Sequence, residues 1–243
     1  MGVLGPGVDD LIELPGQVPL RRDGGTPLYA ARALRFAGAE PVAIEGPTRA
    51  GSRLVHTPGG TMQELIALAE PLDPDWVARE ALPRLRGCNW VVLGGQSARD
   101  FPVETIELLA AAGHLLLLDA QGLARGHRTG PLRLERFGPE TVRGVQALKL
   151  NELEAQALLG EVGLRGLDHL GVPEILLSRG HEGLEVISGG RHERVPPAPH
   201  RFVDPTGAGD SLSALYCLAR TRGTEPAEAA RWAVEQVERL YTS

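Results

Sequence analysis

The chain has 243 residues, of which 42% are hydrophobic and 23% are charged, and its formal net charge is −6. This size and composition suit one soluble domain with a sizeable core, and they exclude a disordered chain, a collagen and a disulfide scaffold. The negative charge argues against a nucleic-acid partner, and no apolar run approaches the roughly 18 residues of a membrane-spanning helix. Cys88 and Cys217 stand far apart, in no metal-binding spacing. We therefore expect a cytoplasmic protein with no nucleic-acid or membrane partner.

In chain order, the N-terminal part is predicted to contain short strands and two helices. Glycine and proline separate the segments, and apolar residues recur with the period of a strand or of a helix. The predicted elements are a strand at 2–5, a hairpin of 11–14 and 18–20, a helix at 26–36, strands at 42–44 and 53–56, and a helix at 73–86.

The remainder of the chain alternates strands and helices more regularly. The predicted elements are strands at 90–93, 114–118, 145–150 and 174–177, helices at 102–112, 152–159, 208–220 and 226–241, and a hairpin of 183–187 and 191–195. This alternation predicts an α/β fold with a mostly parallel central sheet flanked by helices. We expect a single domain over 1–243, with a reduced β-strand lid within about 11–23 and 42–60.

The chain contains a single lysine, Lys149, among its 25 Lys and Arg residues. Such a bias is typical of a GC-rich genome and does not by itself indicate a function. It does exclude a Walker A phosphate loop, since Lys149 stands in Ala-Leu-Lys-Leu-Asn and not in Gly-Lys-Ser/Thr. The His-Arg-Asp and Asp-Phe-Gly sequences of protein kinases are also missing. Any phosphate chemistry must therefore use other groups.

The segment most indicative of chemistry is 203–211, Val-Asp-Pro-Thr-Gly-Ala-Gly-Asp-Ser, which lies between a predicted strand and an apolar helix. Two glycines leave the backbone bare, so its N–H groups can converge on an anion at the positive end of the helix dipole. Asp210 falls in the first helical turn, where a carboxylate can accept a proton from a substrate hydroxyl. The same residues also suit simple helix capping, and the local pattern leaves both interpretations open.

Residues 204–210, Asp-Pro-Thr-Gly-Ala-Gly-Asp, resemble the C-terminal signature of the ribokinase, or PfkB, family of carbohydrate kinases. Three other segments resemble family motifs in the family's order. They are the di-glycine at 24–25 before an alanine-rich helix, the Asn-x-x-Glu of 151–154, and the Ser-Arg-Gly-His-Glu-Gly of 178–183, where the family usually begins with Thr. The resemblance spans nearly the whole chain and implies a ribokinase-like fold.

The resemblance also implies catalytic roles. Asp210 is expected to be the general base, and the backbone amides of Gly207, Ala208 and Gly209 are expected to form the anion hole.

On the donor side, the resemblance implies ATP with Mg²⁺. Asn151 and Glu154 are expected to organise the Mg²⁺ ion through water, which suits a hard cation that keeps several waters. Without the resemblance, the same two residues would be interpreted as a helix start with Asn as N-cap. The residues expected beside the nucleotide are Asn151, Ser178, Gly180, Gly183 and Thr206.

On the acceptor side, the resemblance implies a small sugar or polyol. The expected substrate-binding residues are Asp10, Gly24, Gly25, Gln96, Gln121 and Asp210. Residues 119–125, Asp-Ala-Gln-Gly-Leu-Ala-Arg, resemble a stretch of family members that include inositol kinases. Arg125 is a weaker candidate, because it would equally suit a structural ion pair.

The chain departs from the family in ways that leave its substrate open. Family members are typically longer, and the usual Gly-Asp-Asp stretch is missing between Ile44 and Arg53. Tyr29 replaces an Asn of the first signature. Only 33 residues follow Asp210, so the later loop that contributes to the adenine pocket is expected to be shortened or absent, and no potassium requirement is predicted.

We therefore predict an ATP-dependent sugar or polyol kinase; a homodimer is compatible with the sequence, which does not fix the oligomeric state. Two alternatives stay open: a nucleoside or inositol kinase of the same family, and a non-catalytic nucleotide or sugar sensor descended from a kinase.

Overall fold

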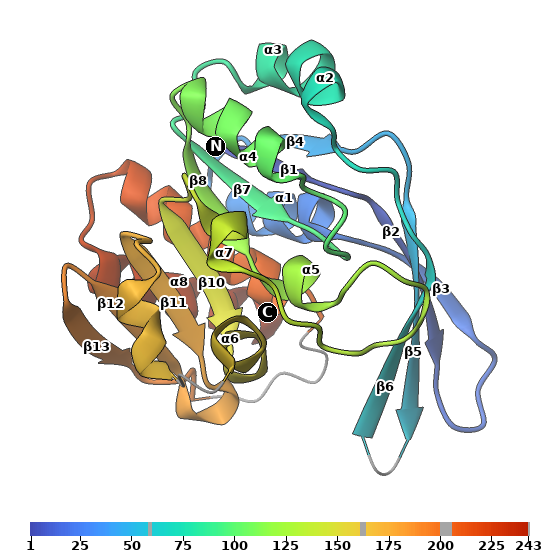
Figure 1. Ribbon diagram of the computed structural model, residues 1–243. Helices are drawn as coiled ribbons and strands as arrows, with labels where there is room; N and C mark the ends of the chain where they lie inside the picture. The colour runs from blue at the N-terminus through green and yellow to red at the C-terminus, as the bar shows by residue number, and fades with distance from the viewer. Residues whose placement is uncertain (58–59, 161–163, 200–205, 243) are drawn as a thin grey trace.

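An eight-stranded sheet forms the centre of the protein (Figure 1). The computed structural model describes residues 1–57, 60–160, 164–199 and 206–242. In sheet order the strands are β13 (Arg191–Val195), β12 (Leu184–Ser188), β11 (Glu174–Ser178), β10 (Ala147–Asn151), β8 (Leu115–Asp119), β7 (Trp90–Gly94), β1 (Gly2–Gly5) and β4 (Val42–Glu45). The strands from β11 to β4 are parallel, and β12 and β13 add an antiparallel edge.

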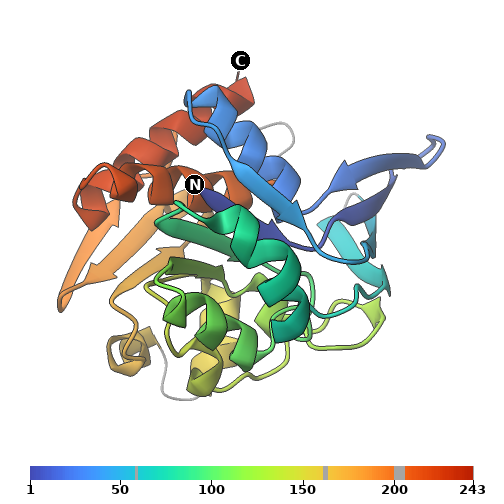
Figure 2. The same ribbon diagram turned by 90° about the horizontal axis from the view of Figure 1, so that it is seen from above.

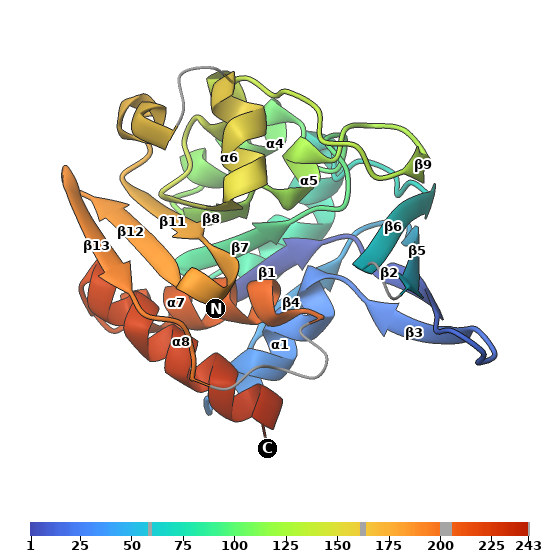
Figure 3. The same cartoon turned by 90° about the horizontal axis from the view of Figure 1, so that it is seen from below.

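Helices cover both faces of this sheet (Figures 2 and 3). One face carries α1 (Thr26–Phe36), α7 (Ala208–Thr221) and α8 (Pro226–Thr242). The other carries α4 (Val103–Ala111), α6 (Glu152–Leu159) and a helical run made of α2 (Pro74–Trp76), the π-helical turn η1 (Val77–Ala81) and α3 (Leu82–Leu85). The short elements are α5 (Gln121–Ala124) and the 3₁₀ turns η2 (Pro139–Val142), η4 (Leu164–His169) and η5 (Gly180–Glu182).

The central strands are buried on both faces, and alternate residues enter two different cores. Val92 and Leu117 pack with α1, α7 and α8, whereas Leu93 and Leu116 pack with the helices of the opposite face. Successive side chains of a strand point to opposite sides, which explains why these strands are continuous apolar runs in the sequence. The predicted α/β fold, a mostly parallel sheet flanked by helices, is confirmed.

A second sheet of five strands projects from the carboxyl end of β1 (Figure 1). We call it the lid sheet. Its strands, in sheet order, are β3 (Leu20–Gly24), β2 (Val8–Glu13), β5 (Ala50–Thr57), β6 (Gly60–Ala67) and β9 (Gly130–Pro131). Because β2 begins only a few residues after β1, the lid sheet is continuous in the chain with the central sheet.

The lid sheet differs from the segments predicted at 11–23 and 42–60. Residues 42–45 form β4, which pairs in parallel with β1 and therefore belongs to the central sheet. In the other direction, β6 runs to Ala67 along β5, and β9 adds a further strand from a distant part of the chain. The lid sheet is therefore wider than the sequence predicts.

The helical run after Asp73 agrees with the sequence. The Asp73 carboxylate accepts a hydrogen bond of 2.8 Å from the Trp76 amide, which is an N-cap. The run continues to Leu85 through the π-helical turn, close to the predicted end at 86. In the described part of the chain, no helix is both long enough and apolar enough to span a membrane.

Candidate active site

A cleft of about 800 Å³ lies between the lid sheet and the carboxyl ends of the central strands. Its walls come from six parts of the chain: β2 and β3 with the start of α1, β5 with β6, the residues that follow β7, the ends of β8 and β10, α5 with Arg125, and the N-terminus of α7. The carboxyl ends of parallel strands are where open α/β sheets bind ligands. The candidate residues that line the cleft are Asp10, Gly25, Gln96, Gln121, Thr206, Gly207, Gly209 and Asp210.

The start of α7 is built as the sequence predicts. Gly207 is the N-cap residue and has φ of 78°, a left-handed conformation that favours glycine. A Cβ on Gly207 would also collide with the ring of Tyr29. The first amides of any helix have no partner within it, so those of Ala208 and Gly209 are available at this end of α7. The motif residues Asp204 and Pro205 lie outside the described residues.

Asp210 lies in the first turn of α7 and is held by a residue from the other end of the chain. Thr26, at the start of α1, donates a hydrogen bond of 2.5 Å from Oγ1 to Oδ1 of Asp210. Burial and the negative charge of Asp119 raise the pKa of Asp210 to about 6. The Thr26 hydrogen bond and the charges of Lys149 and Arg125 act in the opposite direction. A carboxyl with this pKa is mostly ionised at neutral pH and is basic enough to accept a proton.

Asp119 and Lys149 form a buried ion pair in the floor of the cleft. The two residues are register partners on the neighbouring strands β8 and β10. Lys149 Nζ lies 2.7 Å from Oδ2 of Asp119, and Oδ1 of Asp119 accepts a hydrogen bond of 3.1 Å from the Gln121 amide. The carboxylate raises the pKa of Lys149, against the effect of burial, so this lysine is charged.

On the acceptor side, Asp10 is a buried carboxylate of β2. Its Oδ1 accepts a short hydrogen bond from the Ser52 hydroxyl of β5, its parallel register partner. Gly24 lies against the same carboxylate, because a Cβ on Gly24 would collide with Oδ2 of Asp10. Gly25 is the N-cap residue of α1 and lines the cleft, whereas Gly24 supports Asp10 from behind.

Arg125 joins the lid sheet to the loop after β7. Its guanidinium donates a hydrogen bond of 2.5 Å to Oε1 of Gln96 and one of 3.1 Å to Oε1 of Gln63. Burial lowers the pKa of Arg125, although four carboxylates act to raise it. The loop itself is fixed by Asp100, which accepts hydrogen bonds from the amides of Gln96 and Ser97. Gln96 is therefore placed in the cleft by a rigid turn.

Asn151 and Glu154 form a capping box at the start of α6. The Asn151 side chain accepts from the Glu154 amide at 2.9 Å, and Oε2 of Glu154 accepts from the Asn151 amide at 2.8 Å. The structure therefore shows the helix start, with Asn151 as N-cap, that the sequence offered as an alternative to Mg²⁺ binding. This capping role does not prevent the two residues from also organising a Mg²⁺ ion. Oε1 of Glu154 lies outside this pair, and both residues supply the hard oxygen atoms that Mg²⁺ prefers. Burial and Asp119 raise the pKa of Glu154.

The other nucleotide candidates lie beside this capping box. Ser178 ends β11 as the register partner of Asn151, and its hydroxyl donates to the Leu150 carbonyl at 3.3 Å. Gly180 and Gly183 flank the turn η5 that leads into β12. The structure thus groups Asn151, Ser178, Gly180 and Gly183 on and beside neighbouring strand ends, outside the lining of the main cleft, whereas the fifth donor candidate, Thr206, lines the cleft.

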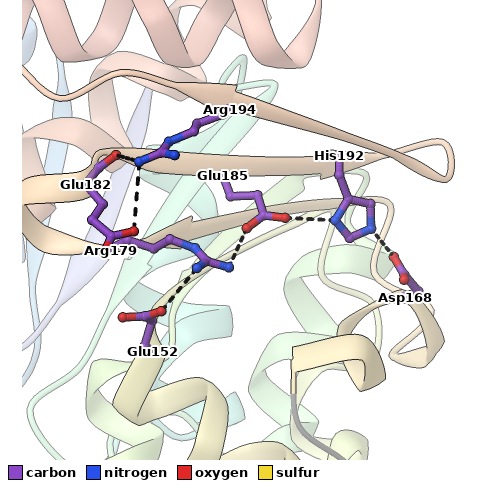
Figure 4. Close-up of polar contacts among 7 residues, drawn as sticks. All are labelled: Glu152, Asp168, Arg179, Glu182, Glu185, His192 and Arg194. Atoms are coloured by element: carbon purple, nitrogen blue, oxygen red, sulfur yellow. Dashed lines mark hydrogen bonds and ion pairs between the residues drawn. The ribbon is translucent and has the colours of Figure 1, made fainter.

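A charged network borders this donor side (Figure 4). In it, Arg179 lies between Glu152 and Glu185, at 3.3 Å and 2.7 Å, and Glu185 contacts His192 at 2.8 Å. His192 also contacts Asp168 at 2.9 Å, and the hydrogen bonds to both carboxylates raise its pKa. These residues belong to α6, η4, β12, β13 and the end of β11. Their charges are largely satisfied by one another.

Two residues of the site were missed by the sequence. Thr26 is recognisable only as the first residue of a helix, and Lys149 only as an isolated lysine. The sequence does not indicate that either residue lies near Asp210. The hydrogen bond from Thr26 and the charge interaction with Lys149 both depend on the tertiary fold. Across the described ranges, no group of three or more His, Cys, Asp or Glu side chains is arranged to hold a metal ion.

Comparison with known proteins finds similarity in sequence over part of the chain. The model of the pfkB family of carbohydrate kinases matches residues 134–235. Over 94 residues the chain is 30% identical to the ribokinase of Bacillus subtilis; the matched segment is 39% of this chain and 32% of that ribokinase, about a third of its length.

Solved structures match the chain over almost its whole length. One is a pyrophosphate-dependent kinase in the ribokinase family, complexed with a pyrophosphate analog and myo-inositol (TM-score 0.81, 18% identity, 99% of this chain and 94% of that one). Another is a Burkholderia thailandensis nucleoside kinase in complex with inosine (TM-score 0.75, 16% identity, 98% of this chain and 90% of that one). A third is the Arabidopsis thaliana ribokinase complexed with ribose and ATP (TM-score 0.71, 17% identity, 100% of this chain and 92% of that one).

At these low identities the solved structures define the fold, which is that of ribokinase. The family model and the B. subtilis relative add a similarity in sequence to the pfkB family of carbohydrate kinases, which the model matches over residues 134–235. The ribokinase-like fold predicted from the sequence is confirmed, and the predicted resemblance to the PfkB family is supported by the match over residues 134–235.

Proposed function

We propose that the protein is a kinase that transfers the terminal phosphoryl group of ATP, with Mg²⁺, to a hydroxyl group of a sugar or polyol. The observation that carries this proposal is the position of Asp210. Its carboxylate lies at the N-terminus of α7 in a large cleft, is oriented by Thr26, and has a pKa near 6. The match of residues 134–235 to the model of the pfkB family of carbohydrate kinases supports the same reaction.

In the proposed mechanism, Asp210 takes the proton from the acceptor hydroxyl as its oxygen attacks phosphorus. The bond between phosphorus and the leaving nucleotide oxygen breaks as the new bond to the acceptor oxygen forms. Backbone amides of Gly207, Ala208 and Gly209 stabilise the charge on the phosphoryl oxygens. The helix dipole of α7 adds to this stabilisation.

On the donor side, Asn151 and Glu154 would hold Mg²⁺ through water, and the ion would neutralise the phosphate charges. Ser178, Gly180, Gly183 and Thr206 would contact the nucleotide. The proximity of the first three residues to the capping box supports this grouping.

On the acceptor side, we propose that Asp10, Gln96 and Gln121 bind substrate hydroxyls, that Gly25 lets the substrate approach the backbone, and that Gly24 leaves room for the Asp10 carboxylate. Neutral amides and one carboxylate match the hydrogen-bonding pattern of a polyhydroxylated ring. Inositol and nucleoside acceptors remain the alternatives, and similar solved structures contain myo-inositol, ribose and inosine.

Pyrophosphate is a second candidate for the donor. Helices α7 and α8 are joined by residues 222–225 alone, so no long loop between them is available to enclose an adenine base. A similar solved structure belongs to a pyrophosphate-dependent kinase. The two candidate donors, ATP and pyrophosphate, are therefore compared directly in the experiment below.

The test is a coupled assay of phosphoryl transfer with ATP/Mg²⁺ and with pyrophosphate/Mg²⁺ as separate donors. The acceptor panel contains pentoses, hexoses, inositols and nucleosides, and Asp210→Asn is measured in parallel. Loss of a general base is expected to lower kcat by roughly 10²–10⁴-fold. Turnover that survives in Asp210→Asn would contradict the mechanism. Ligand binding without turnover by either donor would favour the non-catalytic sensor.

A further inference from the structure

The ammonium group of Lys149 lies against the proposed anion hole. A Cβ placed on Gly209 would come within 2.8 Å of Lys149 Nζ. Both residues line the cleft, together with Asp210 and Gly207. A side chain on Gly209 would therefore press on the ammonium and displace it. The positive charge lies close to Gly209 and in the same cleft as the base.

The hydrogen bonds of Lys149 leave its ammonium with spare capacity. An ammonium has three donors. In the described residues, Lys149 Nζ makes one side-chain hydrogen bond, to Asp119. Because Nζ borders the cleft, the remaining donors can reach a ligand there. A structural ion pair would need neither the cleft nor a glycine beside it.

The composition of the chain points to the same residue. Lys149 is the one lysine, and the other residues among the 25 Lys and Arg of the chain are all arginine. Arginine carries a broad planar fork, whereas lysine carries a compact point charge. At this position the compact ammonium reaches Asp119 and also lies close to Gly209. The one lysine of a chain so strongly biased to arginine therefore falls in the cleft.

We propose that Lys149 is a catalytic residue whose ammonium contacts the transferred phosphoryl group from the Gly209 side of the anion hole. This inference rests on the proposed kinase function. During transfer, the phosphorus–oxygen bond to the donor breaks, the bond to the acceptor oxygen forms, and the acceptor proton goes to Asp210. Lys149 stays protonated throughout and stabilises the charge on the phosphoryl oxygens. Asp119 holds the ammonium in place before the phosphoryl group arrives.

The test compares Lys149→Met, Lys149→Arg, Asp119→Asn and the double variant Lys149→Met/Asp119→Asn. We expect Lys149→Met to lower kcat by roughly 10²–10³-fold, with acceptor KM changed by only a few-fold, because the contact forms on the phosphoryl group. Lys149→Arg should also lose kcat, because its fork does not fit beside Gly209. Circular dichroism and thermal melts establish which variants fold, and Arg84→Met, an exposed change outside the cleft, serves as the control.

The double variant separates catalysis from structure. Removing both charges leaves no unpaired carboxylate, so a purely structural Lys149 predicts that the double variant recovers the kcat of Asp119→Asn. The proposal predicts instead that kcat stays low although stability recovers. Full activity of Lys149→Arg, or recovery of kcat in the double variant, would overturn it.

Binding of inorganic phosphate, measured by calorimetry, provides a readout that does not require turnover. Lys149→Met should weaken this binding at least tenfold, whereas Asp119→Asn should strengthen it, because the ammonium loses its competing partner. Equal phosphate affinity in wild type and Lys149→Met would contradict the proposal. If the wild type binds phosphate through Lys149 but turns over no acceptor, the proposed kinase function fails and the anion site stands.

Discussion

Thr26 and Asp210 are 184 positions apart in the chain, yet the hydroxyl of one donates to the carboxylate of the other at 2.5 Å. The contact joins the first turn of α1 to the first turn of α7, and these two helices pack side by side on one face of the sheet (Figure 3). It fixes the carboxylate that we propose as the base, and it favours the ionised form of that carboxylate.

Removing this hydroxyl should change the pH dependence of the reaction. In Thr26→Ala, the pKa of Asp210 should rise further, so the acid limb of kcat/KM should move to higher pH by roughly one to two units, since a hydrogen bond to a charged group contributes about 1.5–3 kcal/mol. Thr26→Ser keeps the hydroxyl and should keep the wild-type profile. If the Ala and Ser variants share one profile, the hydrogen bond does not control the base.

The wild-type pH profile should itself identify the base. Asp210 must be ionised to accept a proton, and its pKa in the free protein is about 6. The plot of kcat/KM against pH should therefore fall below about pH 6, because that parameter reports ionisations of the free enzyme. A rate that stays constant down to pH 4.5 would exclude Asp210 with this pKa as the base.

Neutralising Asp210 should stabilise the fold while it removes activity. The pKa of Asp210 is raised above its ordinary value of 3.8, so the folded state binds this proton more tightly than the unfolded state does. Between about pH 4 and 6, the contribution of this group to the free energy of unfolding falls as the pH rises. At pH 7.5, Asp210→Asn should raise the free energy of unfolding by up to about 3 kcal/mol, measured by chemical denaturation. Near pH 3.5 the two proteins should differ little.

Substitution of Asn151 can separate capping from a role in metal binding. Asn151→Ala should cost about 1 kcal/mol of stability, because α6 loses its N-cap. Asn151→Ser restores a capping oxygen and should recover most of that stability. If Asn151 also organises Mg²⁺, both variants should show lower kcat and need more Mg²⁺ for half-maximal rate. Wild-type kinetics in Asn151→Ser would assign the residue to capping alone.

A buried cluster remote from the cleft should control stability without affecting kinetics. Glu174 accepts hydrogen bonds from Tyr216 at 2.5 Å and from Arg220 at 2.6 Å. Glu174→Ala leaves both partners without their carboxylate and should cost about 3–5 kcal/mol. The matched control is Glu193→Ala, which removes an exposed ion pair with Arg231 and should cost less than about 1 kcal/mol. Acceptor KM should be unchanged in both variants well below their melting temperatures.

Helices and strands whose boundaries are marked by neighbouring residues in the sequence could be predicted. Strands that form only because another strand pairs with them could not. Helix α1 begins and ends where the sequence indicates, because a proline in its first turn and a glycine after its end mark both boundaries. Strand β6 was not predicted: Met62, Gln63 and Glu64 favour helix, and the strand forms because β5 supplies a partner.

The candidate site follows the same division. Asp210 and the bare backbone at 207–209 could be recognised because they are contiguous in the chain. Lys149 and Asp119 meet through the parallel register of β10 on β8, which no local motif encodes. The capping box of 151–154 shows the opposite case, where one motif satisfies a structural role and leaves oxygen atoms for a second role.

The short pairing between β6 and β9 has a mechanical consequence. Through this pairing, β6 is hydrogen-bonded to the segment that follows Arg125. On the other side of the lid sheet, β2 is connected through the chain to β1. A sheet anchored at two points can twist more easily than it can swing open. Moving this edge of the lid sheet away from the cleft would therefore require either breaking the β6–β9 pairing or extending residues 126–129.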